Sequence, residues 1–303
     1  MVSRLAPSPT GVLHLGNART FLLNWLMVRA VGGQLLLRIE DIDGPRVREG
    51  AEEAAIEDLQ WLGLDWDGEL IRQSDRLSCY RDAADRLLAA GLAYPCICSR
   101  KEVEAAASAP HETWQDAVAY PGTCRGRWSS LNEARDATGR EPAVRFLVEE
   151  TECRFEDGFR GAELGRIRGD FVIQKRDGGP AYQLAAVVDD AATGVDTVVR
   201  GDDLLASTPR QLLLYRALEL AAPSFVHLPL LVGPDGLRLA KRHGDTSLRS
   251  FRQAGVSPGE IVGYLAEVSG LRVSGPCSAQ ELLAGFTLDR VPDLPVLVDR
   301  RFG

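Results

Sequence analysis

A short basic segment near the end of the chain has the composition of a phosphate-binding loop. Residues 237–248 read LRLAKRHGDTSL in a protein whose net charge is −8. The basic side chains of this segment are Arg238, Lys241, Arg242 and His243. A lysine meets a phosphate as a point charge, so Lys241 can neutralise the charge that grows on a departing pyrophosphate. A lone basic run is more often a solvated turn, and that alternative holds unless a second segment supports binding.

A second segment of this kind lies near the N-terminus. Residues 10–20 read TGVLHLGNART, in which His14 and Asn17 flank Gly16 at the start of an expected helix. Helix N-termini expose N–H groups and a partial positive charge, so phosphates bind there. By spacing alone, His14 is explained equally well as a helix cap and Gly16 as relief of crowding. The two segments together favour a single cradle for a nucleoside triphosphate, built from distant parts of the chain.

The elements around the second segment predict a βαβ unit. Residues 2–6 fit a strand, apolar residues at helical spacing follow as far as Gly32 and Gly33, and QLLLRIED at 34–41 fits a buried parallel strand. Such units are right-handed by strong preference, and ligands bind at the carboxyl ends of their strands. We therefore expect the site in the loops that follow the two strands.

The remaining pattern predicts a doubly wound α/β fold with an insertion. Helices are expected over 46–62 and 75–91, antiparallel strands between 143 and 178, and a further helix with Thr208 as its N-cap and Pro209 as its first residue. The last stretch reads as mainly helical. The expected parts are a Rossmann-like catalytic domain with a parallel sheet (1–91 and 181–236), a zinc-bearing inserted lobe (92–180), and the basic loop with a small helical C-terminal lobe (237–303).

Composition excludes some classes of protein. The chain has 45% hydrophobic and 26% charged residues, the ordinary mix of a globular protein. It has no apolar run of about 18 residues and no apolar N-terminal signal region, so we expect a cytoplasmic protein without a membrane partner. The negative net charge argues against a general nucleic-acid coat, but it allows RNA to bind at a local basic surface.

Three cysteines fit part of a metal site. Cys96, Cys98 and Cys124 can supply three of the four ligands of a tetrahedral, structural zinc. His111, Tyr120 or a water would complete the set, and zinc chemistry alone favours His111 because imidazole is a better ligand than phenolate. Three buried thiols without a metal are the simpler alternative.

Several motifs resemble those of the class I aminoacyl-tRNA synthetases, in particular their glutamate-specific branch. HLGN at 14–17 resembles the first signature, with Asn17 where a second histidine often stands, and RLAKR at 238–242 resembles the second, with Ala240 in place of the usual serine. The longer matching stretches are RLAPSPTGVLHLGNART, LLLRIEDID, LQWLGLDWD, QSDRLSCYRDAADRLLAAGLAYPC, AYQLAAVVDD and VVRGDDLLASTPRQLLLYRAL. The resemblance covers most of the chain, up to residue 252.

The resemblance implies an ATP-dependent ligase that acts on tRNA. Little chain follows the second signature, where glutamyl-tRNA synthetases carry a long anticodon-binding region, so the sequence resembles the shorter glutamyl-queuosine tRNA(Asp) synthetases. That family activates glutamate with ATP and Mg²⁺ and then esterifies it onto the queuosine base in the anticodon of tRNA(Asp). We expect a monomer.

The resemblance also implies roles for individual residues. The planar guanidinium of Arg4 suits a carboxylate, and Glu40 would accept a hydrogen bond from the substrate ammonium. The implied glutamate-binding set is Arg4, Leu5, Ala6, Pro7, Ser8, Glu40, Tyr182 and Arg200. The implied ATP-binding set is His14, Gly16, Asn17 and Lys241, of which His14, Asn17 and Lys241 are the expected catalytic residues. The pattern C-x-C followed by Y-x-x-x-C favours Tyr120 over His111 as the fourth zinc ligand.

Simpler interpretations of these residues remain. Without the resemblance, Glu40 is a surface acid and Arg200 pairs with Asp202 or Asp203. For the whole chain, one alternative is a glutamyl-tRNA synthetase without its C-terminal part, which charges tRNA(Glu). The other is a catalytically silent relative that binds RNA or glutamate, suggested by the unusual Asn17 and Ala240.

Overall fold

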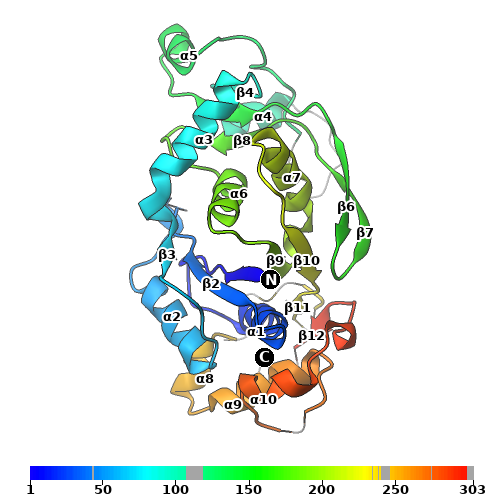
Figure 1. Ribbon diagram of the computed structural model, residues 1–303. Helices are drawn as coiled ribbons and strands as arrows, with labels where there is room; N and C mark the ends of the chain where they lie inside the picture. Colours follow the sequence, from blue (N-terminus) through cyan, green and yellow to red (C-terminus); the bar gives the residue numbers. More distant parts are fainter. Residues whose placement is uncertain are drawn as a thin grey trace.

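The computed structural model describes residues 1–42, 44–106, 119–233, 235–237, 239, 246–273 and 275–298. Lys241 with most of its basic segment, and His111, lie outside these residues, so their predicted roles stay predictions. The molecule is elongated (Figure 1). The β4–β5–β8 sheet lies at one end, the parallel strands β1, β2, β9 and β10 lie in the middle, and helices α9 and α10 lie at the other end.

The N-terminal βαβ prediction is confirmed. Strand β1 (Val2–Leu5), helix α1 (Leu15–Ala30) and strand β2 (Gln34–Ile39) follow one another, and the two strands pair in parallel. The turn after α1 needs glycine, because a side-chain carbon on Gly33 would lie 2.6 Å from the carbonyl oxygen of Met1. Helix α1 packs against both strands and, on another side, against α9, so it lies at the centre of the fold.

The rest of the first half matches the predicted helices, which are shorter than expected. Helix α2 covers Ala51–Trp61 and α3 covers Leu77–Ala89, while short 3-10 turns occupy Gly44–Arg46 and Gln73–Arg76. Strand β3 (Ile71–Arg72) pairs in parallel with β2.

The second half adds a second sheet whose parallel strands lie edge to edge with the first. Its elements are α6 (Tyr182–Ala192), β9 (Thr197–Gly201), α7 (Thr208–Ala217) and β10 (Ser224–Leu228), and β9 pairs in parallel with β10. The amide of Asp196 donates to the carbonyl of Val2 at 3.0 Å, which sets β9 beside β1. The strands therefore run in the order β3–β2–β1–β9–β10, and the order reverses between β1 and β9. Ligands of doubly wound sheets bind at this kind of reversal.

The predicted cap of α7 is wrong. Ser207 is the N-cap, Thr208 is the first helical residue and Pro209 lies in the first turn. The Thr208 hydroxyl is buried and accepts a hydrogen bond from Arg200 at 2.8 Å, so it serves a tertiary contact in place of capping.

The region between the two halves holds two antiparallel groups of strands. Strands β4 (Ala93–Cys96), β5 (Ala143–Phe146) and β8 (Phe171–Gln174) form one sheet, flanked by α4 (Arg100–Ala106) and α5 (Leu131–Thr138). The hairpin of β6 (Glu152–Asp157) and β7 (Gly161–Arg166) differs from the expectation, because β6 also pairs in parallel with β10 of the central sheet.

The last part is mainly helical, as predicted. It contains α8 (Leu248–Gln253), α9 (Pro258–Val268) and α10 (Ala279–Leu282), and the core they form with α1 is apolar. The short strand β12 (Val296–Leu297) was not predicted and pairs with β11 (Leu231–Val232). Among the described helices, none has both the length and the apolar character that crossing a membrane requires.

Candidate active site

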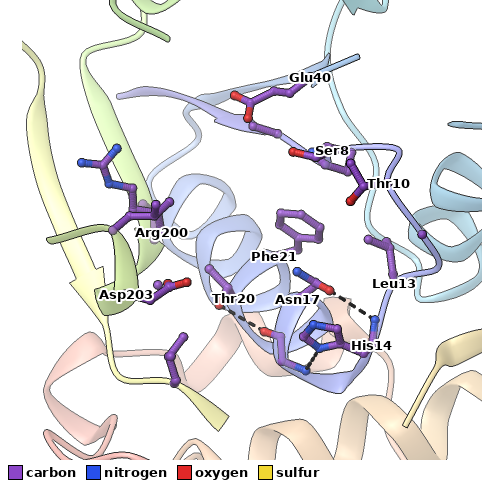
Figure 2. A pocket seen from close by; sticks show the side chains of 18 of the residues that line it. Ser8, Thr10, Leu13, His14, Asn17, Thr20, Phe21, Glu40, Arg200 and Asp203 are labelled. Atoms are coloured by element: carbon purple, nitrogen blue, oxygen red, sulfur yellow. Dashed lines mark hydrogen bonds between the residues drawn. The ribbon is translucent and has the colours of Figure 1, made fainter. Parts of the chain in front are cut away.

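A cavity of about 450 Å³ opens where the strand order reverses. Figure 2 shows Glu40 and Arg200 toward one end of it and His14 and Asn17 at the other. The predicted site residues that line the cavity are Arg4, Ala6, Pro7, Ser8, His14, Gly16, Asn17, Glu40, Tyr182 and Arg200. Leu5 does not line it: strand alternation turns its fully buried side chain into the core.

The first predicted phosphate segment forms the N-terminus of α1. His14 is the N-cap, its Nδ1 accepts from the amide of Gly16 at 3.1 Å, and the side chain of Asn17 accepts from the amide of His14 at 3.3 Å. With Nδ1 as acceptor, a neutral His14 carries its proton on Nε2. The capping role that the sequence suggested is therefore present, and the same ring lines the cavity.

The second predicted segment reaches the first at both of its described ends. A side-chain carbon on Gly16 would lie 3.8 Å from Cδ1 of Leu239. The amide of Leu15 donates to the carbonyl of Thr246 at 3.1 Å, and His14 and Ser247 form an antiparallel bridge. The chain on either side of the basic residues thus lies against the start of α1, as the single-cradle prediction requires.

A buried network of charges lies at the other end of the cavity. Asp190 of α6 accepts through Oδ1 from Nε of Arg4 at 3.1 Å and from Nη1 of Arg38 at 2.5 Å. Nη2 of Arg38 donates to Glu40 at 3.1 Å. Burial raises the pKa of Glu40 even though Arg38 and Arg4 oppose the shift. Glu40 is therefore held by the network and is not a solvated surface acid.

Arg200 differs from these arginines because its hydrogen-bond partners among the described residues are all neutral side chains. Among the described residues its hydrogen-bond acceptors are His227 Nε2 at 3.0 Å, Gln211 Oε1 at 2.8 Å, Thr208 Oγ1 at 2.8 Å and the Tyr182 hydroxyl at 3.4 Å. The predicted alternative of an ion pair with Asp202 or Asp203 is thus not what the structure has. Burial lowers the pKa of Arg200, which is only 5% exposed.

At this end of the cavity the arginines differ in how their charges are paired. Arg4 and Arg38 are ion-paired with Asp190 and Glu40, whereas the hydrogen-bond partners of Arg200 among the described residues include no carboxylate. A buried charge is costly unless it is paired. Arg200 is therefore a buried cation at the cavity that can pair with a carboxylate of a ligand.

The three predicted metal-binding cysteines come together. Their sulfur atoms lie within 4.8 Å of one another, and the Tyr120 hydroxyl lies 3.4 Å from Cys96 Sγ and 3.7 Å from Cys98 Sγ. The Arg145 guanidinium lies 3.1 Å from Cys96 Sγ and over the Tyr120 ring, where its charge stabilises anionic ligands. The donor set fits a tetrahedral Cys₃Tyr site, since Zn–S bonds of about 2.3 Å put the sulfurs of one tetrahedron roughly 4 Å apart.

Several residues of the site were not predicted. Asp190 holds both Arg4 and Arg38, and Arg38 in turn donates to Glu40. His227 and Gln211 hold Arg200. Each is a polar side chain in an apolar stretch, such as QLLLRI or FVHL. A polar residue in such a stretch is expected to have a buried hydrogen-bond partner, so this pattern could have identified these residues in the sequence. Further residues that line the cavity are Thr10, Thr20, Phe21, Gly201, Asp203, Leu204 and Leu230.

Comparison with known proteins gives the family. The family model described as the catalytic domain of class I tRNA synthetases (E and Q) matches residues 1–299. A glutamyl-Q tRNA(Asp) synthetase of Symbiobacterium thermophilum is 51% identical, covering 98% of this chain and 96% of that relative. A glutamate–tRNA ligase of Aquifex aeolicus is 41% identical, covering 98% of this chain but 64% of the relative.

A solved structure agrees in fold. The glutamate tRNA ligase of Elizabethkingia meningosepticum, crystallised in complex with its amino acid, superposes with a TM-score of 0.83 at 28% identity, covering 99% of this chain and 67% of that one. The chain therefore belongs to the class I tRNA synthetases of the glutamate and glutamine group, and within that group to the family of the glutamyl-Q tRNA(Asp) synthetases.

Proposed function

We propose that this protein activates glutamate with ATP and transfers it to the queuosine base in the anticodon of tRNA(Asp). Relatives that bear this name match almost the whole chain, at 51% and 48% identity. The observation that carries the amino-acid part is Arg200, a buried cation whose described partners are all neutral. A substrate side-chain carboxylate is the counter-ion that this arrangement lacks.

In the first step the α-carboxylate of glutamate attacks the α-phosphorus of ATP, giving glutamyl-adenylate and pyrophosphate. Glu40 accepts a hydrogen bond from the substrate ammonium, and Arg4 with Arg200 attracts the carboxylates. Tyr182 borders the same pocket. Such a transfer depends mainly on positioning and on neutralising the charge that develops, so the protein needs no covalent intermediate.

ATP lies toward the start of α1 in this proposal. The Nε2–H of His14 and the Asn17 side chain face the phosphates at the positive end of α1, and Lys241 neutralises the leaving pyrophosphate. Mg²⁺ accompanies ATP and is held largely by phosphate oxygens and water. The contacts of Leu15 and His14 with Thr246 and Ser247 support this role, because they bring the flanks of the basic segment to the same place.

The inserted region holds one structural zinc in this proposal. Cys96, Cys98, Tyr120 and Cys124 are its ligands, and filling all four positions from protein leaves none for chemistry. The ion would fix the strand end at Cys96 to the loop at Cys124. The division into a catalytic domain, a zinc-bearing insertion and a helical C-terminal lobe belongs to the same proposal.

The decisive experiment measures exchange of pyrophosphate into ATP without RNA. Glutamate should support exchange, whereas aspartate and glutamine should not. Exchange that requires tRNA(Glu) would favour an ordinary glutamyl-tRNA synthetase. Acylation of tRNA(Asp) that disappears when the tRNA lacks queuosine would establish the second step. The variant Lys241→Ala should lose adenylate formation, and unchanged exchange in this variant would contradict the role given to Lys241.

A further inference from the structure

Three buried side chains behind the cavity are linked by hydrogen bonds, from Asp157 through His227 to Arg200. Oδ2 of Asp157 lies 2.6 Å from Nδ1 of His227, and Nε2 of His227 lies 3.0 Å from Nε of Arg200. Strands β6, β10 and β9, which lie side by side, supply one residue each (Figure 1). His227 has no exposed surface, and Arg200 is the member that reaches the cavity.

The two hydrogen-bond partners of His227, Asp157 and Arg200, determine which ring nitrogen carries the proton. A guanidinium can only donate, so Nε2 of His227 must accept from Arg200, and Nδ1 must carry the proton that goes to Asp157. The ring is thus neutral. Burial lowers the pKa of His227, in agreement with this state, and the charge of Arg200 acts in the same direction.

A neutral imidazole can orient the Arg200 guanidinium without neutralising its charge. A carboxylate in contact with Arg200 would hold the guanidinium in place, but it would also neutralise it and compete with an anionic ligand. An imidazole accepts the same hydrogen bond without a charge, and the carboxylate that orients the ring stays one side chain further away. Gln211 and Thr208 are neutral acceptors in the same way.

We propose, on the basis of the function given above, that Asp157 and His227 are positioning residues for the choice of glutamate. They aim the Arg200 guanidinium into the cavity and leave its charge for the substrate's side-chain carboxylate, which the carboxamide of glutamine cannot replace. Neither residue touches the substrate in this proposal. Their effect is on the affinity for glutamate and on its selection over glutamine.

The isosteric variant Asp157→Asn tests the tautomer. Oδ1 of Asp157 accepts from the backbone amides of Phe159 at 3.0 Å, Arg160 at 3.0 Å and His227 at 3.2 Å. These three donors keep the asparagine oxygen at that position, so its NH₂ group faces Nδ1 of His227. Nδ1 must then accept, and the proton moves to Nε2, which can donate it to Thr208 Oγ1 at 3.1 Å. Nε2 then no longer accepts from Arg200, so the guanidinium loses this hydrogen bond.

In glutamate-dependent pyrophosphate exchange without RNA, Asp157→Asn should raise the KM for glutamate about 10- to 100-fold, the usual value of a buried charge-assisted hydrogen bond. The KM for ATP should stay within about twofold of the original value, and the preference for glutamate over glutamine should fall. The matched control is Asp170→Asn, a carboxylate equally buried in contacts with Tyr94 and Arg125 away from the cavity; its KM for glutamate should not change.

A second pair of variants tests the acceptor directly. Glutamine at 227 can place its amide oxygen near the position of Nε2, whereas asparagine is one carbon shorter and reaches only the position of Nδ1. His227→Gln should therefore keep most of the affinity for glutamate that His227→Asn loses. The comparison of His227→Gln with His227→Asn still tests the inference if Asp157→Asn fails to fold.

Two results would overturn the inference. One is an unchanged KM for glutamate in both Asp157→Asn and His227→Asn. The other is an equal rise of the KM for glutamate and for ATP, because a general loss of structure affects both. Absence of glutamate-dependent exchange in the unaltered protein is a different result, which would reject the proposed function itself.

Discussion

Arg38 and Asp190 are 152 residues apart in the chain, yet Nη1 of Arg38 lies 2.5 Å from Oδ1 of Asp190. The contact joins β2 of the first half to α6 of the second, directly behind the cavity. Arg4 of β1 donates to the same oxygen. Burial alone would raise the pKa of Asp190, but Arg38 and Arg4 lower it below its usual value. One ionised carboxylate thus holds together the three elements that form the amino-acid end of the site.

Asp190→Asn should therefore destabilise the protein strongly. The amide leaves two buried guanidinium groups without part of their counter-charge, and loss of one partner from a buried ion pair costs about 3–5 kcal/mol. Denaturant unfolding measures this change. The control is Asp65→Asn, whose exposed carboxylate pairs with Arg29 and should contribute less than about 1 kcal/mol. Equal losses in the two variants would contradict the importance given to the buried network.

Replacing Arg200 should affect glutamate selectively. In Arg200→Gln the cavity loses the guanidinium proposed to pair with the substrate's side-chain carboxylate, so the KM for glutamate in RNA-free exchange should rise at least about 100-fold, as expected for a charge-assisted contact in a buried site. The KM for ATP should change little. Arg216→Gln, which removes an exposed arginine paired with Glu150, is the matched control. A normal KM for glutamate in Arg200→Gln would show that another group binds the side-chain carboxylate.

Glutamate binding should weaken on the acid side of neutrality. Because burial raises the pKa of Glu40, this carboxyl takes up a proton at a higher pH than an ordinary glutamate. Only the ionised form accepts from the substrate ammonium, so the KM for glutamate should rise as pH falls, and the rise should begin at a higher pH than the titration of an ordinary glutamate. In Glu40→Gln the KM should be high throughout and lack this rise. A parallel rise in both proteins would assign the titration to another group.

Most of the framework could be predicted from the sequence. Apolar runs, Gly32 with Gly33 and the spacing of α1 identified the βαβ unit, because local pattern determines such elements. The same pattern put His14 at the start of a helix, where ligands bind, whereas the role of Arg4 came from the resemblance to the family. Contacts between distant elements could not be read in this way. The pairing of β6 with β10 is a contact between distant parts of the chain. The alternating sequence of β6 would be the same if this strand belonged to the β4–β5–β8 sheet, so the sequence does not reveal its partner.

Polar residues in the core show the same limit. Thr208 has the sequence context of an N-cap, but its hydroxyl is used by Arg200, and the cap falls to Ser207. His227 and Asp157 come from different strands, and only the folded chain puts one behind the other. Sequence can mark such residues as out of place among apolar neighbours, but their partners become clear only from the structure.

The cysteine cluster should bind one zinc per chain. Metal analysis of the purified protein should give about one equivalent, and Cys98→Ser should lower it because four-coordinate structural sites need every ligand. Removal of the metal with a chelator should make the region between β4 and β5 easier to cleave with protease. Cys277→Ser, which changes a cysteine outside the cluster, should retain the metal. Full metal content in Cys98→Ser would remove this residue from the ligand set.

Gly165 of β7 should be intolerant of any side chain. A side-chain carbon there would lie 2.0 Å from Cγ of Pro209, and a proline ring at the start of α7 cannot move aside. Gly165→Ala should therefore lower the free energy of unfolding by about 1–3 kcal/mol, the usual cost of overpacking. Gly285→Ala, where no atom of another part of the chain lies within 4 Å of the added carbon, is the control for the substitution itself. Thermal or denaturant unfolding compares the two, and equal stabilities would mean that the hairpin does not pack against α7 this closely.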